Sequence, residues 1–143
     1  MGSVNRGITT RRWDVNVAKY ETVTRLTPAF RDLRGLIVNV LSEPIQHVAV
    51  IHSVAGSVRA RHFHPVDRQR MYCISGKYIA RSAPVRAEID NGQIVIVPDG
   101  DTRESIVDPG DLTECPAMAA HEYLHMEDTV ALNLNIVNRT PET

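Results

Sequence analysis

The sequence has too few cysteines for a disulfide framework. Cys73 and Cys115 are the two cysteines in 143 residues, and a lone pair in different local sequences predicts two reduced thiols. A chain of this length can bury a core without bridges or a structural metal. We therefore expect one domain, residues 1–143, that is stabilised by its own hydrophobic core.

Long apolar runs and strong net charge are also absent. No run approaches the roughly 18–20 apolar residues that a membrane-spanning helix needs, and the first residues lack the apolar centre of a signal peptide. The formal net charge is −1, which gives no electrostatic reason to expect nucleic acid or an anionic membrane surface as a partner. These absences favour a cytoplasmic protein that binds neither nucleic acid nor membrane.

Helical periodicity is almost absent, and short β-branched or apolar runs take its place. Gly, Pro and Asp residues separate these runs, a pattern typical of an all-β sandwich or barrel. The predicted strands cover residues 36–41, 47–54, 58–64, 69–75, 77–81, 94–97, 103–107, 112–114, 120–124 and 129–137. The first 30 residues are less regular, and we expect them to form an arm or an added edge strand beside a barrel of about residues 31–137.

One short motif carries two histidines with the spacing of a strand face. In His62-Phe63-His64 the two imidazoles point to the same side, because side chains two residues apart share a face of a strand. Gln69 follows after a turn that would fold the next strand back, and His121 opens another strand far downstream. Three imidazoles and one amide inside a barrel predict a divalent metal site with open positions for water or substrate. Iron, zinc, nickel, copper and manganese all suit imidazole ligands.

The joint spacing of these residues resembles the first motif of the cupin superfamily. That motif has glycine, five residues, His-x-His, three or four residues, glutamate, six residues and a second glycine. The chain matches it with Gly56, His62, His64, Gln69 and Gly76. Gln69 is the departure, because the family has glutamate there. A neutral amide would leave more positive charge on a bound metal, or the site would bind metal poorly or not at all.

The second cupin motif is matched downstream with two departures. The family has glycine, five residues, Pro-x-Gly, two residues, histidine, three residues and asparagine. Gly110, Pro116 and His121 stand at matching positions, whereas Met118 replaces the turn glycine and His125 replaces the asparagine. The resemblance runs over residues 56–125 and implies an all-β, single-domain cupin, which is a double-stranded β-helix or jelly-roll barrel.

Two segments also resemble small cupins that act on nucleotide-linked sugars. One is an Asp-x-Arg-Gly segment that begins at Asp32, for which a structural salt bridge is the alternative, and the other covers residues 56–62. In the dTDP-4-keto-6-deoxyhexose 3,5-epimerases the second stretch carries an arginine for the nucleotide phosphate and a histidine base. These roles fall here on Arg59 and His62. The dTDP-sugar 3,4-ketoisomerases have a similar arginine before a His-x-His pair, here His62 and His64.

The resemblance therefore implies a metal-dependent isomerase or epimerase of a keto-sugar, with the sugar linked to a nucleotide. Without metal, His62 or His64 would remove the proton beside the ketone. With metal, His62, His64, Gln69 and His121 would be the ligands. His125 and Tyr123 share the strand parity of His121, so each can line the cavity as a proton donor or serve the structure alone.

Arginines near the first motif are the candidates for binding a diphosphate. They are Arg59, Arg61 and Arg70. Strand parity places Arg59 on the face opposite His62 unless a bulge intervenes. His47 and His52 lie outside both motifs, and we interpret them as structural.

Other functions fit the same residues. An iron-dependent dioxygenase would use three histidines with open positions for oxygen, and a noncatalytic small-molecule binder would use the cavity alone. A cyclase, lyase or decarboxylase of another small carbonyl compound also stays open, because a fold does not determine a function. Small cupins with an extra N-terminal segment commonly pair through sheet edges, so the resemblance implies a homodimer as well.

Overall fold

The computed structural model of the chain describes residues 19–135, and every regular element in that part is a β-strand. The strands are β2 (Thr22–Arg25), β3 (Phe30–Asp32), β4 (Gly35–Ile37), β5 (His47–Ser53), β6 (Val58–His62), β7 (Gln69–Ser75), β8 (Tyr78–Asp90), β9 (Gln93–Pro98), β10 (Arg103–Val107), β11 (Asp111–Cys115), β12 (Ala119–His125) and β13 (Thr129–Asn135). The all-β prediction is confirmed. Within residues 19–135 no helix is long and apolar enough to cross a membrane.

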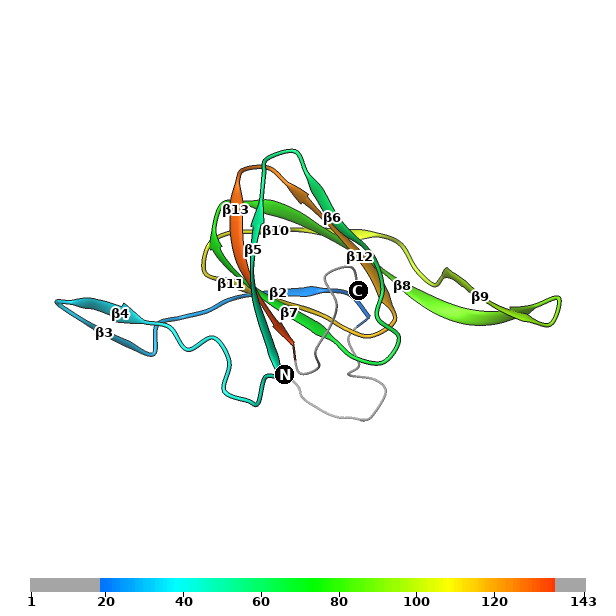
Figure 1. Cartoon of the computed structure of the whole chain (residues 1–143), viewed down its shortest axis with the longest axis horizontal. Helices are drawn as coiled ribbons and strands as arrows, with labels where there is room; N and C mark the ends of the chain where they lie inside the picture. Colours follow the sequence, from blue (N-terminus) through cyan, green and yellow to red (C-terminus); the bar gives the residue numbers. More distant parts are fainter. Residues whose placement is uncertain (1–18, 136–143) are drawn as a thin grey trace.

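Two five-stranded antiparallel sheets form the body of the molecule (Figure 1). One has the order β10-β8-β12-β6 with β9 paired to β8, and the other has the order β2-β11-β7-β13-β5. The edge strand β2 pairs with β11, so a segment before residue 30 belongs to the second sheet. The predicted runs 69–75 and 103–107 coincide with β7 and β10, and residues 136–137 of the last predicted run lie outside the described residues.

The space between the sheets is filled by alternate residues of the strands. In β12 the buried positions are Ala119, His121, Tyr123 and His125, which is the two-residue period of a strand with one face inward. The apolar core contains residues from both sheets: Met71, Cys73, Tyr78, Ala80, Val107, Tyr123 and Ala131. Both cysteines are buried and free, as predicted. The interior therefore combines an apolar core with inward-facing imidazoles.

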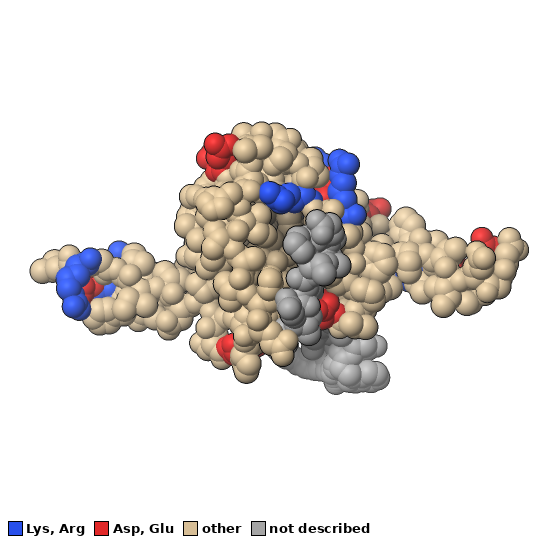
Figure 2. Space-filling model, viewed as in Figure 1, with Lys and Arg blue, Asp and Glu red and all other residues tan. Residues whose placement is uncertain are grey.

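Two ribbons project from opposite ends of this body (Figures 1 and 2). One is the β3–β4 hairpin, in which Arg34 Nη2 lies 2.6 Å from a carboxylate oxygen of Asp32. This ion pair is the structural salt bridge considered for the Asp-x-Arg-Gly segment. The other is the outer part of β8, residues 85–90, paired with β9. The predicted run 77–81 was too short, because β8 continues through Pro84 to Asp90.

Candidate functional site

Three imidazoles from distant parts of the sequence meet between the sheets. The ring centroids are 4.7 Å apart for His62 and His64, 4.9 Å for His62 and His121, and 5.7 Å for His64 and His121. One nitrogen of each ring lies within 4.8 Å of the others. The pairing of β6 with β12 sets His62 opposite His121, and His64 lies just beyond the end of β6. The structure thus brings together the three histidines that the motif spacing singled out.

A β-bulge in β6 places Arg59 and His62 on the same side. Ala60 and Arg61 have φ values of 72° and 65°, and the register passes from His62 opposite His121 to Ala60 opposite Glu122. The extra residue interrupts the two-residue alternation of the strand. Arg61 is therefore turned outward, where its Nε lies 3.2 Å from Glu122 Oε1. The sequence left open whether a bulge would bring Arg59 to the face of His62. The structure contains this bulge, and the Arg59 side chain faces the cavity.

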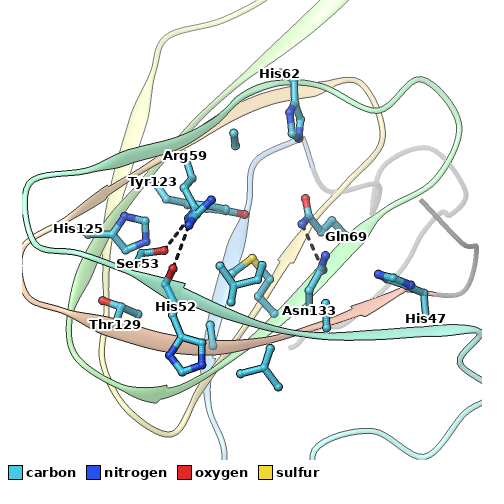
Figure 3. A pocket seen from close by; sticks show the side chains of 16 residues that line it. His47, His52, Ser53, Arg59, His62, Gln69, Tyr123, His125, Thr129 and Asn133 are labelled. Carbon is cyan, nitrogen blue, oxygen red and sulfur yellow. Dashed lines mark hydrogen bonds between the residues drawn. The ribbon is translucent and has the colours of Figure 1, made fainter. Parts of the chain in front are cut away.

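Gln69 lies beside the histidines, and Asn133 orients it. The Gln69 amide nitrogen donates to Asn133 Oδ1 at 3.2 Å (Figure 3). This contact turns Gln69 Oε1 toward His64, whose Nε2 lies 3.3 Å away. Three imidazole nitrogens and an amide oxygen within such distances are a donor set that fits a divalent first-row metal ion. The four donors are neutral, so an ion bound there would keep its charge and its Lewis acidity.

A hydrogen-bonded chain connects His121 Nδ1 to Tyr123 and Glu21. The Tyr123 hydroxyl donates to Glu21 Oε2 at 2.7 Å and lies 2.9 Å from His121 Nδ1. Burial raises the pKa of Glu21 to about 7, and the hydrogen bond from Tyr123 opposes that rise. Burial and the Glu21 charge raise the pKa of Tyr123 well above its ordinary value, so its hydroxyl stays protonated. Sequence reasoning missed Glu21, which belongs to neither motif.

Arg59 and His125 line the other side of the cavity (Figure 3). The Arg59 guanidinium donates from Nε to Ser53 Oγ at 2.6 Å and from Nη2 to the His52 carbonyl oxygen at 2.9 Å. Among residues 19–135 it forms no ion pair with a carboxylate. His125 Nδ1 lies 3.1 Å from the Ser57 carbonyl oxygen and donates to it. Burial and the Arg59 charge lower the pKa of His125, so this ring is a neutral imidazole with Nε2 as acceptor.

The cavity between these groups has a volume of about 550 Å³, within the range of small-molecule sites. His47 lines it on the side of Gln69, although the sequence interpretation treated His47 as structural. Alternation along β5, where His47 shares the inward parity of Ser53, is the signal that could have found it. His52 is exposed, and it contributes its carbonyl oxygen to Arg59.

The remaining two arginine candidates do not line this cavity. Arg61 is turned outward by the bulge. Arg70 is buried on the face of β7 opposite Gln69, because neighbouring residues of a strand point to opposite sides, and it forms an ion pair with Glu43. Arg59 is therefore the one arginine among the three candidates that a cavity ligand can reach.

Solved structures of sugar-nucleotide enzymes superimpose on this architecture. The RmlC epimerase of Mycobacterium tuberculosis gives a TM-score of 0.65 at 19% identity, over 94% of this chain and 70% of that one. The QdtA sugar 3,4-ketoisomerase of Thermoanaerobacterium thermosaccharolyticum gives 0.62 at 15% identity, over 87% and 85%. The dTDP-4-dehydrorhamnose 3,5-epimerase of Sulfolobus tokodaii gives 0.61 at 16% identity, over 78% and 68%. The chain has the RmlC-like cupin fold. Its sequence matches no protein-family model and no curated protein.

At one departure from the second motif, the backbone has the conformation that usually favours glycine. Met118 stands where the second motif has a turn glycine, and its φ is 59°, in the left-handed region. Its amide donates to the His64 carbonyl oxygen at 2.9 Å, and its own carbonyl accepts from Val85. The chain therefore has a left-handed backbone at this turn with a side chain that disfavours it.

Proposed function

We propose that this cupin is an isomerase or epimerase of a keto-sugar linked to a nucleoside diphosphate. The observation that carries the proposal is the bulge in β6, which sets the Arg59 guanidinium and the His62 imidazole on the same wall of one cavity. The Arg59 guanidinium has no carboxylate partner among residues 19–135, which suits a diphosphate, and a neutral imidazole suits removal of a proton beside a ketone. The fold likeness to epimerases and ketoisomerases supports the same chemistry.

The reaction needs one base and one site for the negative charge. The base takes the proton from the carbon beside the ketone, and the electron pair of that bond moves onto the carbonyl oxygen to give an enediolate. Return of a proton to the opposite face of the same carbon gives the epimer. Alternatively, protonation of the former carbonyl carbon, with loss of the neighbouring hydroxyl proton, moves the ketone by one position. His62 faces the cavity as the base of the metal-free site.

We propose further that His62, His64, His121 and Gln69 hold a divalent cation, with iron, zinc, nickel and manganese as the candidate ions. A bound cation would supply Lewis acidity toward the sugar oxygens. Coordination would occupy His62, so His125 Nε2 would then be the neutral imidazole left to accept the proton. Which histidine acts as the base therefore depends on whether a cation occupies the site. The variants His62→Asn and His125→Asn distinguish the two possibilities.

The decisive experiment uses TDP-4-keto-6-deoxyglucose, a ligand found in the structure of a QdtA variant. The purified protein is incubated with this compound in D2O, deuterium at the sugar carbons is followed by NMR, and the metal content is measured by elemental analysis. We expect deuterium beside the ketone in the wild type and none in His62→Asn. His125→Asn should exchange normally if the site is metal-free and should lose exchange if the cation is bound.

Other outcomes would replace the proposal. Oxygen consumption by an iron-loaded protein, without deuterium uptake, would establish the dioxygenase alternative. Tight binding of the nucleotide sugar with neither exchange nor oxygen uptake would indicate a noncatalytic binder. Absence of both binding and exchange, with correctly folded protein, would reject the nucleotide-sugar assignment.

We also propose that two copies of the chain associate. In the β8–β9 ribbon, Ile89 lies directly opposite Ile94, and the two side chains are 74% and 72% exposed. An isolated two-stranded ribbon is only marginally stable in water, and exposed aliphatic faces mark protein contacts. Light scattering should give the mass of a dimer for the wild type and for the control Glu88→Gln, and a lower mass for Ile94→Lys. A monomeric wild type would contradict the proposal.

A further inference from the structure

We propose that Glu21 is a positioning residue that selects the tautomer of His121 through Tyr123. The three residues form one buried hydrogen-bonded line between the N-terminal edge strand and the histidine cluster. The inference concerns which of the two ring nitrogens of His121 carries the proton. It rests on the proposed function only for its consequence in turnover.

The argument starts from the number of hydrogens on the Tyr123 hydroxyl. The hydroxyl has one hydrogen, and at 2.7 Å from Glu21 Oε2 it donates that hydrogen to the carboxylate. It can then only accept from His121 Nδ1, which lies 2.9 Å away. A neutral imidazole carries a single N–H, so a proton on Nδ1 leaves Nε2 as an acceptor. Through the tyrosine, the carboxylate thus determines which nitrogen of the His121 ring carries the proton.

The tautomer matters because of what surrounds His121. The cluster of His62, His64 and His121 brings one nitrogen of each ring within 4.8 Å of the others. A ring nitrogen can act there as a metal ligand or as a proton acceptor only when it is deprotonated. Outer partners that orient a histidine in this way typically change metal affinity or activity by about 10–100-fold when they are removed.

The fold anchors Glu21 for this role. Its backbone amide donates to Ser82 Oγ of β8 at 2.9 Å, and the next residue begins β2, which pairs with β11. Glu21 and Tyr123 are 8% and 3% exposed, so bulk water does not compete for the hydrogen bond between them. These contacts hold the carboxylate in place.

The test compares Glu21→Leu with Glu21→Gln in protein labelled with 15N-histidine, at alkaline pH where Glu21 is ionised. The wild type should show His121 protonated on Nδ1, and Glu21→Gln should keep that pattern because the amide retains an acceptor oxygen. In Glu21→Leu the Tyr123 hydroxyl loses its acceptor and should donate to His121 Nδ1. The proton should then appear on Nε2.

A second measurement separates the tautomer from folding and from catalysis. Titration with Zn²⁺ should give an affinity at least about 10-fold lower for Glu21→Leu than for Glu21→Gln. If Glu21→Leu does not fold, the wild-type spectrum alone still decides, because an Nε2-protonated His121 in the wild type would overturn the proposal. An unchanged tautomer in folded Glu21→Leu would do the same. If the sugar assay fails while the tautomer responds as described, the proposed function fails and this inference stands.

Discussion

Replacing Gly76 with alanine should destabilise the protein far more than the same change at Gly56. Both glycines belong to the first motif, and their φ values are nearly equal, +88° and +85°. An alanine pays the left-handed backbone cost of about 1–2 kcal/mol at either position. At Gly56 the new Cβ meets nothing within 4 Å. At Gly76 it would lie 2.7 Å from Thr129 Oγ1 and 2.8 Å from Thr129 Cα, and closer still to the Asp128 carbonyl oxygen.

The second cost at Gly76 comes from steric overlap with backbone atoms, which cannot rotate away. Overpacking of this kind typically costs about 1–3 kcal/mol. We therefore expect a loss of about 1–2 kcal/mol for Gly56→Ala and of about 2–5 kcal/mol for Gly76→Ala. The larger loss is a substantial share of the roughly 5–15 kcal/mol that stabilises a typical domain.

Urea unfolding measures both variants against the wild type. With a slope of about 1–3 kcal/mol per molar urea, an extra loss of about 2 kcal/mol at Gly76 should lower the midpoint by roughly a further 1 M. The slopes should stay equal, because the surface exposed on unfolding is unchanged. Equal midpoints for the two variants would refute the reasoning, since the difference between them comes from the contacts with Asp128 and Thr129 alone.

Three further predictions use the same structure. Met118→Gly should raise the unfolding free energy by about 1 kcal/mol in urea titrations, because glycine adopts the observed φ of 59° without strain. Arg59→Met should weaken dTDP binding by about 10–100-fold in calorimetry, the equivalent of one charged hydrogen-bonded contact, and unchanged affinity would exclude Arg59 from the phosphate site. Burial lowers the pKa of His125, so its protonation favours the unfolded chain, whereas protonation of Glu21, whose pKa is raised to about 7, favours the folded chain over the same range. Because Glu21 is present in both proteins, the Tm of the wild type relative to His125→Asn should fall as the pH drops below the ordinary histidine pKa.

The histidine cluster could be predicted from the sequence because its spacing depends on features that a single strand and its turns determine. The alternation of His62 and His64, the turn before Gln69 and the distance to His121 together match two motifs. The outcome for Arg59 depended on one inserted residue in β6, which only the pairing with β12 reveals. The alternation of side chains along the strand therefore predicted that Arg59 would share a face with His62 only if a bulge lay between them. It could not predict whether that bulge exists.

Other parts of the structure lay beyond sequence reasoning for identifiable reasons. The predicted run ended at residue 81, whereas β8 continues to Asp90 and includes Pro84, a residue type that is uncommon inside a strand. Glu21 and Tyr123 are 102 residues apart, and no local pattern links a single glutamate near the N-terminus to a tyrosine on β12. Contacts of this kind form only when the two sheets pack against each other.

The position of Glu21 just before β2 has a practical consequence for anyone who shortens the chain. A fragment that begins at residue 30 would retain both histidine motifs, Gln69 and Arg59, and by its sequence would look like an intact cupin. It would nevertheless lack the carboxylate behind Tyr123 and the edge strand next to β11. Fragments and chimaeras of this protein should therefore be designed to start upstream of Glu21.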